Sequence, residues 1–157
     1  MEILKKIIII LLSAAYLISC GFTPIYSKKI LDFQINTVEF EGDREIKAVL
    51  LSNLNTYKNN EKSMYDYDLQ ILAKKNVEIV SRNTKGEATA YKLNINSTVK
   101  IFLNNELYLT KNYSNSSTYS SEKKVIKLKE VEHRNLLDLS SKLVDEIILT
   151  LSLTNTN

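Results

Sequence analysis

Apolar and polar side chains alternate along three stretches in the middle of the chain, a period of two that is typical of strands with one buried face. The stretches run from Tyr65 to Ile79, from Tyr91 to Leu103 and from Leu107 to Tyr113. The third loses its pattern over residues 114–117, where polar residues follow one another. Because polar segments separate the stretches, we predict three consecutive strands joined by hairpins.

The two connections between these strands carry residues that suit tight turns. Residues 81–86 are polar and end in Gly86. Asn104 and Asn105 form the second connection, and asparagine tolerates the positive φ angles that two-residue hairpins require. A shorter stretch, Ile35–Phe40, alternates imperfectly and is predicted to be a first strand.

Two segments have the three- and four-residue spacing of amphipathic helices. One runs from Arg44 to Tyr57, and Asp43 before it is a suitable N-cap. The other runs from about Glu122 to Leu153 without Gly or Pro. The sequence therefore predicts an α+β fold in the order β-α-β-β-β-α, with two helices packed on one face of a four-stranded, mostly antiparallel sheet. The opposite face of that sheet is predicted to be polar.

The start of the chain has a pattern that belongs to export. Lys5 and Lys6 precede an almost wholly apolar run, Ile7–Ile18, which is shorter than the roughly 20 residues of a membrane-spanning helix. The run leads into Leu17-Ile18-Ser19-Cys20, which resembles the lipobox of exported bacterial proteins. The alternatives are an ordinary signal peptide followed by an unmodified cysteine, and a cytosolic protein with a buried apolar helix.

The lipobox divides the chain into three predicted parts: a lipoprotein signal peptide over 1–19, a lipidated tether over 20–31 and a single α+β domain over 32–157. Cys20 is the only cysteine, so it cannot close an internal disulfide, and acylation gives it a role. We expect a diacylglycerol and an N-acyl chain on Cys20, which together anchor a protein stably, and no other cofactor. Gly21 follows the cysteine, where Asp would favour retention in the inner membrane, so we expect the outer membrane.

Composition and charge narrow the function classes. The chain has 157 residues, with 21 Lys and Arg against 18 Asp and Glu, and no concentrated basic face of the kind that nucleic-acid binding requires. It has three glycines and one proline, which argues against a loop-rich or multi-domain protein. We therefore expect one domain that does not bind nucleic acid.

The residues that catalysis requires are few. His133 is the only histidine, so no second histidine is available as a base for a serine nucleophile. Asp66 and Asp68 share one strand face and could serve as an acid/base or metal pair, but alternation on a polar face also produces such pairs. No glycine-rich loop or Cys/His cluster is present. We therefore predict a protein that is not an enzyme and has no catalytic or metal site.

Basic residues offer the remaining candidate chemistry, because Lys and Arg are natural partners of phosphate groups. Arg82 and Lys85 lie in or next to the predicted hairpin loop, and Lys74-Lys75 interrupt the strand before it. A second cluster precedes and opens the last helix: Lys123, Lys124, Lys127, Lys129 and Arg134. The alternative is that these are ordinary solvated surface charges with acidic neighbours.

One segment carries a family resemblance. Cys20-Gly21-Phe22-Thr23-Pro24-Ile25-Tyr26 resembles the mature start of the lipopolysaccharide-assembly outer-membrane lipoproteins, in particular the alphaproteobacterial type, which often reads C-G-F-x-P-L-Y there. The likeness continues in outline through Tyr65–Leu69, Arg82, Glu87–Leu93, Tyr113–Tyr119 and Glu132–Asn135. The last helix is less alanine-rich than in that family, so the correspondence weakens after Ser120.

The resemblance implies a function as well as a place in the cell. The family's lipoprotein plugs an outer-membrane β-barrel from the periplasmic side, helps that barrel to assemble, and binds lipopolysaccharide on its way to the cell surface. It implies lipopolysaccharide contacts at basic positions near strand ends, which correspond here to Arg82 and Lys85. The alternative is a lipoprotein accessory subunit of another envelope lipid-transport or cell-wall complex, since the same tether and fold class would serve it.

Overall fold

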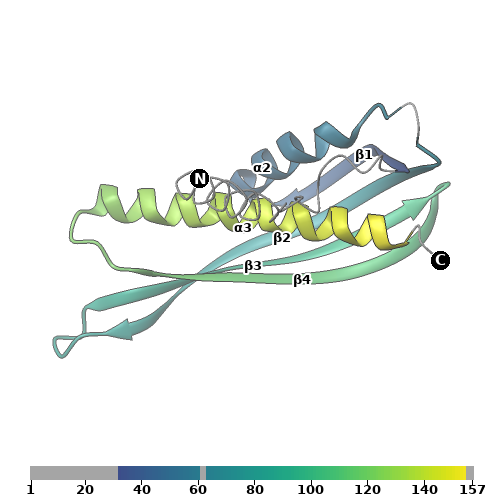
Figure 1. The fold of residues 1–157 in the computed structure, drawn as a ribbon. Coiled ribbons are helices and arrows are strands. Elements are labelled where there is room, and N and C mark those ends of the chain that lie inside the picture. Colours follow the sequence, from purple (N-terminus) through teal and green to yellow (C-terminus); the bar gives the residue numbers. More distant parts are fainter. Residues whose placement is uncertain (1–31, 61–62, 155–157) are drawn as a thin grey trace, which may run out of the picture. The chain divides into compact units, whose positions relative to one another are not determined.

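The structure, a computed structural model, describes residues 32–60 and 63–154 (Figure 1). Its elements follow in the order β1 (Phe33–Gly42), α2 (Arg44–Leu54), η1, a short 3-10 helix (Asn55–Tyr57), β2 (Tyr65–Arg82), β3 (Ala88–Leu103), β4 (Glu106–Ser120) and α3 (Val125–Thr154). The predicted order and the α+β class are confirmed. The predicted signal peptide and tether, 1–31, lie outside the described residues.

The four strands form one sheet in the order β1-β2-β3-β4. β1 pairs with β2 in parallel, whereas β2 with β3 and β3 with β4 are antiparallel. A parallel pair needs a crossover connection, and α2 provides it. Asn104 and Asn105 have φ angles of 53° and 64°, so they form the predicted tight turn between β3 and β4.

The core lies between the sheet and the two helices, which cover the same face of the sheet (Figure 1). Each covered strand contributes alternate residues, as the predicted pattern requires. The buried residues of the middle strands are Tyr67, Leu69, Ile71, Ala73, Leu93, Ile95, Val99 and Ile101. Those of the helices are Ile46, Leu50, Leu54, Leu136, Leu139, Leu143, Val144, Ile147, Ile148 and Leu151.

The imperfect alternation of β1 has a local cause. Phe33 and Ile35 are buried, but the next residues that turn toward the core are Val38 and Phe40, which changes the parity. The register with β2 shifts between Ile35 and Thr37, so the strand bulges at this point. A bulge inserts one extra residue and moves all later side chains to the opposite parity.

β1 ends at a glycine whose backbone lies close to β2. Gly42 has a φ of 127°, and a Cβ atom there would lie 1.9 Å from the carbonyl oxygen of Ala73. The Asp43 N–H donates to the same oxygen at 3.1 Å. The Asp43 carboxylate accepts the backbone N–H of Lys75 at 2.6 Å and makes no side-chain cap bond to α2. Asp43 is the N-cap residue of α2, as predicted, but its carboxylate binds β2 in place of the first turn of the helix.

β4 is longer than predicted and continues through 114–117 to Ser120. Tyr113, Asn115 and Tyr119 of β4 are buried, so alternation does persist there. Asn115 donates to Glu146 of α3 at 2.8 Å, so this buried polar side chain has a hydrogen-bond partner. Because Asn115 is polar, the alternation of apolar residues did not predict this part of the strand. α3 begins at Val125, slightly later than predicted.

The far part of the β2–β3 hairpin, residues 76–90, is here called the distal hairpin. β1 pairs with β2 only as far as Ala73. The remainder of β2 has β3 on one side and, among the residues that the structure describes, no strand on the other. Figure 1 shows this hairpin curving away from the beginning of α3. Val77, Ile79 and Val80 are accordingly 37%, 42% and 48% exposed, although the first two keep the parity of the core residues.

Candidate functional site

The tip of the distal hairpin is held in shape by its own hydrogen bonds. The Asn83 side-chain oxygen accepts the N–H groups of Lys85 at 2.9 Å and Glu87 at 3.0 Å, and its amide donates to the Glu87 carboxylate at 2.8 Å. Gly86 supplies a positive φ of 82°. The loop is therefore a preorganised turn that presents the side chains on either side of it.

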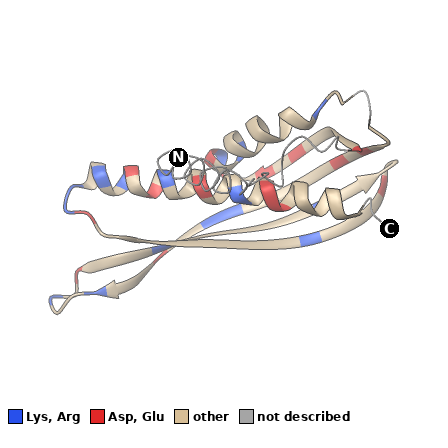
Figure 2. Ribbon diagram, in the orientation of Figure 1, with Lys and Arg blue, Asp and Glu red and all other residues tan. Residues whose placement is uncertain are grey.

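Arg82 and Lys85, the predicted lipopolysaccharide contacts, both lie at this tip and are exposed. Arg82 donates one guanidinium N–H to the Gly86 carbonyl at 2.7 Å, which closes the loop and leaves the other N–H groups available. Neither residue has an ion-pair partner among the described residues. Figure 2 shows basic residues at this tip and around the start of α3. The tip can therefore offer two unneutralised cations to an anion.

Lys75 has a different role from the one its position beside Lys74 indicated. Its ammonium group lies 2.7 Å from the Glu45 carboxylate of α2 and 3.7 Å from the Glu132 carboxylate of α3. The hydrogen bond to Glu45 raises the pKa of Lys75, and the same bond lowers the pKa of Glu45. Lys75 therefore joins both helices to the sheet and is not available to bind an anion.

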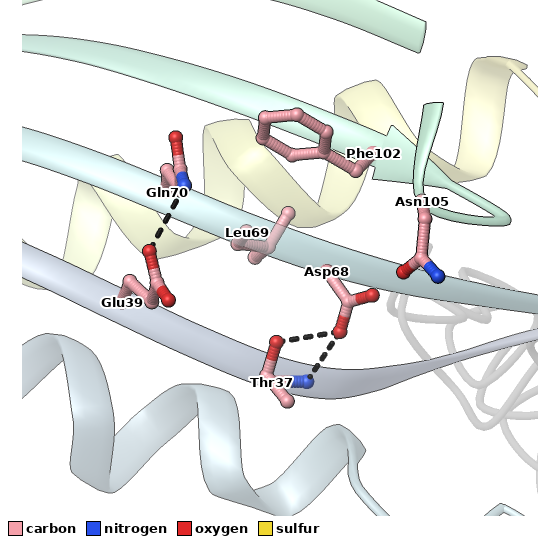
Figure 3. A pocket seen from close by; sticks show the side chains of 7 residues that line it. All are labelled: Thr37, Glu39, Asp68, Leu69, Gln70, Phe102 and Asn105. Carbon is pink, nitrogen blue, oxygen red and sulfur yellow. Dashed lines mark hydrogen bonds between the residues drawn. The ribbon is translucent and has the colours of Figure 1, made fainter. Parts of the chain in front are cut away.

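Asp68 and Glu39, two carboxylates of the open sheet face, accept hydrogen bonds from the neighbouring strand (Figure 3). Asp68 accepts the N–H of Thr37 at 3.1 Å and its hydroxyl at 2.5 Å, and Gln70 donates to Glu39 at 2.9 Å. Asp66 accepts an N–H of Gln34 at 2.8 Å. A shallow hollow of about 230 Å³ lies over these residues and is bounded by Phe102.

Glu39, Asp66 and Asp68 are thus hydrogen-bond acceptors within the sheet. In the part of the chain that the structure describes, no group of three or more His, Cys, Asp or Glu side chains is arranged to hold a metal ion. His133 lies on an exposed part of α3. Cys20, the predicted lipid attachment site, lies outside the described residues.

Neither a protein-family model nor a curated protein sequence matches the chain. Solved structures that resemble it include rare lipoprotein B from Shewanella oneidensis, with 12% identity and a TM-score of 0.60 over 78% of this chain and 98% of that one. They also include an uncharacterized lipoprotein B from Nitrosomonas europaea, with 16% identity and a TM-score of 0.58 over 80% of this chain and 88% of that one. A minor lipoprotein from Acinetobacter baumannii has 15% identity and a TM-score of 0.54 over 76% of this chain and 92% of that one. The chain has the fold of these bacterial lipoproteins.

That likeness extends over nearly the full length of the Shewanella lipoprotein, so the α+β arrangement is shared as a whole. Across residues 32–60 and 63–154, no helix combines the length and the apolar character that crossing a membrane requires.

Proposed function

We propose that this protein is an outer-membrane lipoprotein of the lipopolysaccharide-assembly machinery. Acylated Cys20 anchors it on the periplasmic side of the membrane. The folded domain plugs the lipopolysaccharide-translocating β-barrel and helps it to assemble. The domain also binds lipopolysaccharide during its delivery to the cell surface.

One observation carries the proposal, namely the shared fold with bacterial lipoproteins B over almost their whole length. The lipobox that ends at Cys20 supports it independently, because the sequence before the domain and the fold of the domain point to the same class of protein. The lipid would hold the domain close to a membrane partner and so raise its effective concentration there.

The open face of the sheet suits a plug for a wet barrel, because the lumen of an outer-membrane barrel is polar. Pairs of polar side chains cross this face from strand to strand. Thr98 donates to Asn112 at 2.8 Å, Ser114 donates to Asn96 at 2.8 Å, and Asn94 donates to Glu78 at 3.0 Å. Such a face can lie against water or a polar wall without leaving hydrogen-bonding groups unpaired.

The hairpin tip suits the phosphorylated headgroup of lipopolysaccharide. The guanidinium of Arg82 can form paired hydrogen bonds to phosphate oxygens, and the ammonium of Lys85 adds a mobile point charge. The turn that carries both residues is already ordered by Asn83, so little conformational freedom is lost on binding.

The anchor is tested with Cys20→Ser, and Ser19→Ala is its matched control because it keeps a small residue before the cut. We expect the control and the natural chain to fractionate with membranes and to carry fatty-acid mass on the first mature residue. The Cys20→Ser protein should be soluble in the periplasm and unacylated. Unchanged membrane fractionation of Cys20→Ser would refute the anchor.

The barrel partner is tested in the same preparation by a pull-down of the tagged natural chain from detergent-solubilised native membranes. We expect a stoichiometric outer-membrane β-barrel protein. A periplasmic or inner-membrane complex in its place would favour the alternative of an accessory subunit in another envelope pathway.

Lipopolysaccharide binding is tested with Arg82→Glu/Lys85→Glu. The control, Lys123→Glu/Lys124→Glu, makes the same change in charge at two exposed residues just before α3. Charge-assisted hydrogen bonds contribute about 1.5–3 kcal/mol each, so the tip variant should bind purified lipopolysaccharide at least about tenfold more weakly, with the control nearly unaffected. Equal losses in both variants would mean that only overall charge matters.

A further inference from the structure

Beyond Ala73, the edge of β2 that β1 does not cover carries backbone N–H and C=O groups that point away from β3. The Lys75 N–H points to this side, because it donates to the Asp43 carboxylate at the end of β1. Backbone groups alternate sides along a strand, so the N–H and C=O groups of Val77 and Ile79 face the same way. Within residues 32–60 and 63–154, no hydrogen bond reaches these groups of Val77 or Ile79.

The side chains next to this edge are apolar and uncovered. Val77 and Ile79 are 37% and 42% exposed on the core-facing side of β2. Natural sheets protect such edges with charges, prolines or bulges. Here the charged Glu78 lies on the other face, where Asn94 donates to it, and Lys75 is bound to Glu45. A register shift between Ile79 and Ser81 ends the regular edge, so the unprotected part is short and defined.

We propose that the edge of β2 at Val77–Ile79 is a strand-addition site, where an extended segment of a partner protein pairs with β2 in the line that β1 vacates. Unpaired backbone donors and acceptors in register recognise another extended backbone, and the alternate apolar side chains select its sequence. The segment would carry apolar residues on the side of Val77 and Ile79. The inference rests on the proposed function only in taking the partner from the same membrane complex.

The charges near the distal hairpin indicate the polar face of the partner segment, and they argue against a second copy of this chain as the partner. Charges within the distal hairpin are balanced, but Lys74 and Lys92 at its base give residues 74–92 an excess of basic over acidic side chains. Two copies joined at this edge would bring two such hairpins together, and like charges repel. The partner segment is therefore neutral or acidic on its polar face.

Amide hydrogen exchange tests the pairing directly. Exchange at Val77 and Ile79 is compared between the purified isolated chain and the complex solubilised from native membranes, with residue-level readout. Asn76 and Glu78 are the internal control, because their N–H groups face β3 on the ladder side. We expect Val77 and Ile79 to exchange rapidly in the isolated chain and at least about tenfold more slowly in the complex, with the control protected in both.

Val77→Lys/Ile79→Lys tests whether the edge is needed for association, since an edge lysine opposes strand addition. Val125→Lys/Ile126→Lys is the matched control, because these residues are also apolar and are 67% and 74% exposed. Both variants should keep their circular dichroism spectra. The edge variant should recover at most about a tenth of the companion protein that the control recovers.

The outcomes separate this inference from the proposed function. Rapid exchange at Val77 and Ile79 in a complex that contains the barrel overturns the strand-addition site alone. Protection in a complex with a different companion supports the site and contradicts the barrel. Protection in the isolated chain, together with a dimer in sedimentation, means that a second copy fills the edge, and recovery of no companion at all counts against both proposals.

Discussion

The two halves of β2 have the same pattern and opposite surroundings. From Tyr67 to Ala73, every second residue is buried under the helices. From Val77 to Ile79, residues of the same parity are more than a third exposed. The first half has β1 beside it, whereas no strand within residues 32–60 and 63–154 lies beside the second half on that side.

The comparison shows that alternation identifies the face of a strand and does not say whether anything covers that face. Whether a part of β2 is covered depends on how far β1 and the helices extend beside it. β1 ends at Gly42, whose backbone lies too close to Ala73 for any side chain, and α2 begins two residues later. The core half of β2 is thus where the fold is stabilised, and the distal half is where the strand has groups left to bind something else.

The largest test of this comparison uses one residue type in both halves. Ile71 and Ile79 lie on the same face of β2 and are 2% and 42% exposed. Ile71→Ala should lower the free energy of unfolding by about 4 kcal/mol, because it removes buried methyl groups and leaves a cavity. Ile79→Ala should cost less than about 1 kcal/mol. Urea unfolding measures both, and equal losses would mean that the distal half is as well packed as the core half.

A second test compares the glycine that ends the covered half with the glycine of the hairpin tip. Gly42→Ala should cost about 3 kcal/mol, since its positive φ is strained for alanine and the new Cβ would meet the Ala73 carbonyl. Gly86→Ala keeps the strain alone, because no atom lies within 4 Å of its Cβ position, and should cost about 1 kcal/mol. Thermal unfolding gives the two values. A Gly42→Ala protein as stable as Gly86→Ala would show that β1 and β2 can separate here at little cost.

Much of the fold could be predicted from the sequence, because its strands and helices bury apolar residues at regular spacing. The end of β4 could not, since Asn115 turns a polar side chain inward and finds Glu146 of α3 far along the chain. Asp43 was correctly predicted as the N-cap residue, but the bond of its carboxylate to β2 was not, because a side chain beside a helix start can equally well bind the neighbouring strand.

For the candidate site, the prediction of a polar hairpin loop between two strands correctly put Arg82 and Lys85 close together. The sequence could not predict that the Arg82 side chain is held by a hydrogen bond to the Gly86 carbonyl, because that bond depends on the shape of the turn. The open edge at Val77 and Ile79 was not recognised either. A signal for it existed, because the predicted first strand, Ile35–Phe40, was too short to cover the strand beside it.

The smallest test asks how far the buried core extends across the sheet, from β2 through β3 to β4. Tyr91 of β3 pairs with both Ile79 of β2 and Tyr119 of β4, and the Tyr91 and Tyr119 rings stack at 5.7 Å. Ile79 is exposed, but Tyr119 is only 7% exposed, so the boundary passes between them. Burial, with the nearby charge of Glu132, raises the pKa of Tyr119 to about 12.

A raised pKa means that the folded state holds the phenol proton more tightly than the unfolded state does. The resulting stability is complete below the unfolded value near pH 10 and is lost as the pH rises from there to about 12. Burial also raises the pKa of Tyr67 and Tyr113, so absorbance at 295 nm should show several late-titrating tyrosines, of which one is absent from Tyr119→Phe. The natural chain should lose more stability than this variant between pH 10 and 12. If Tyr119→Phe instead loses a tyrosine that titrates near the ordinary pKa of 10, Tyr119 lies in solvent and the core includes less of β4.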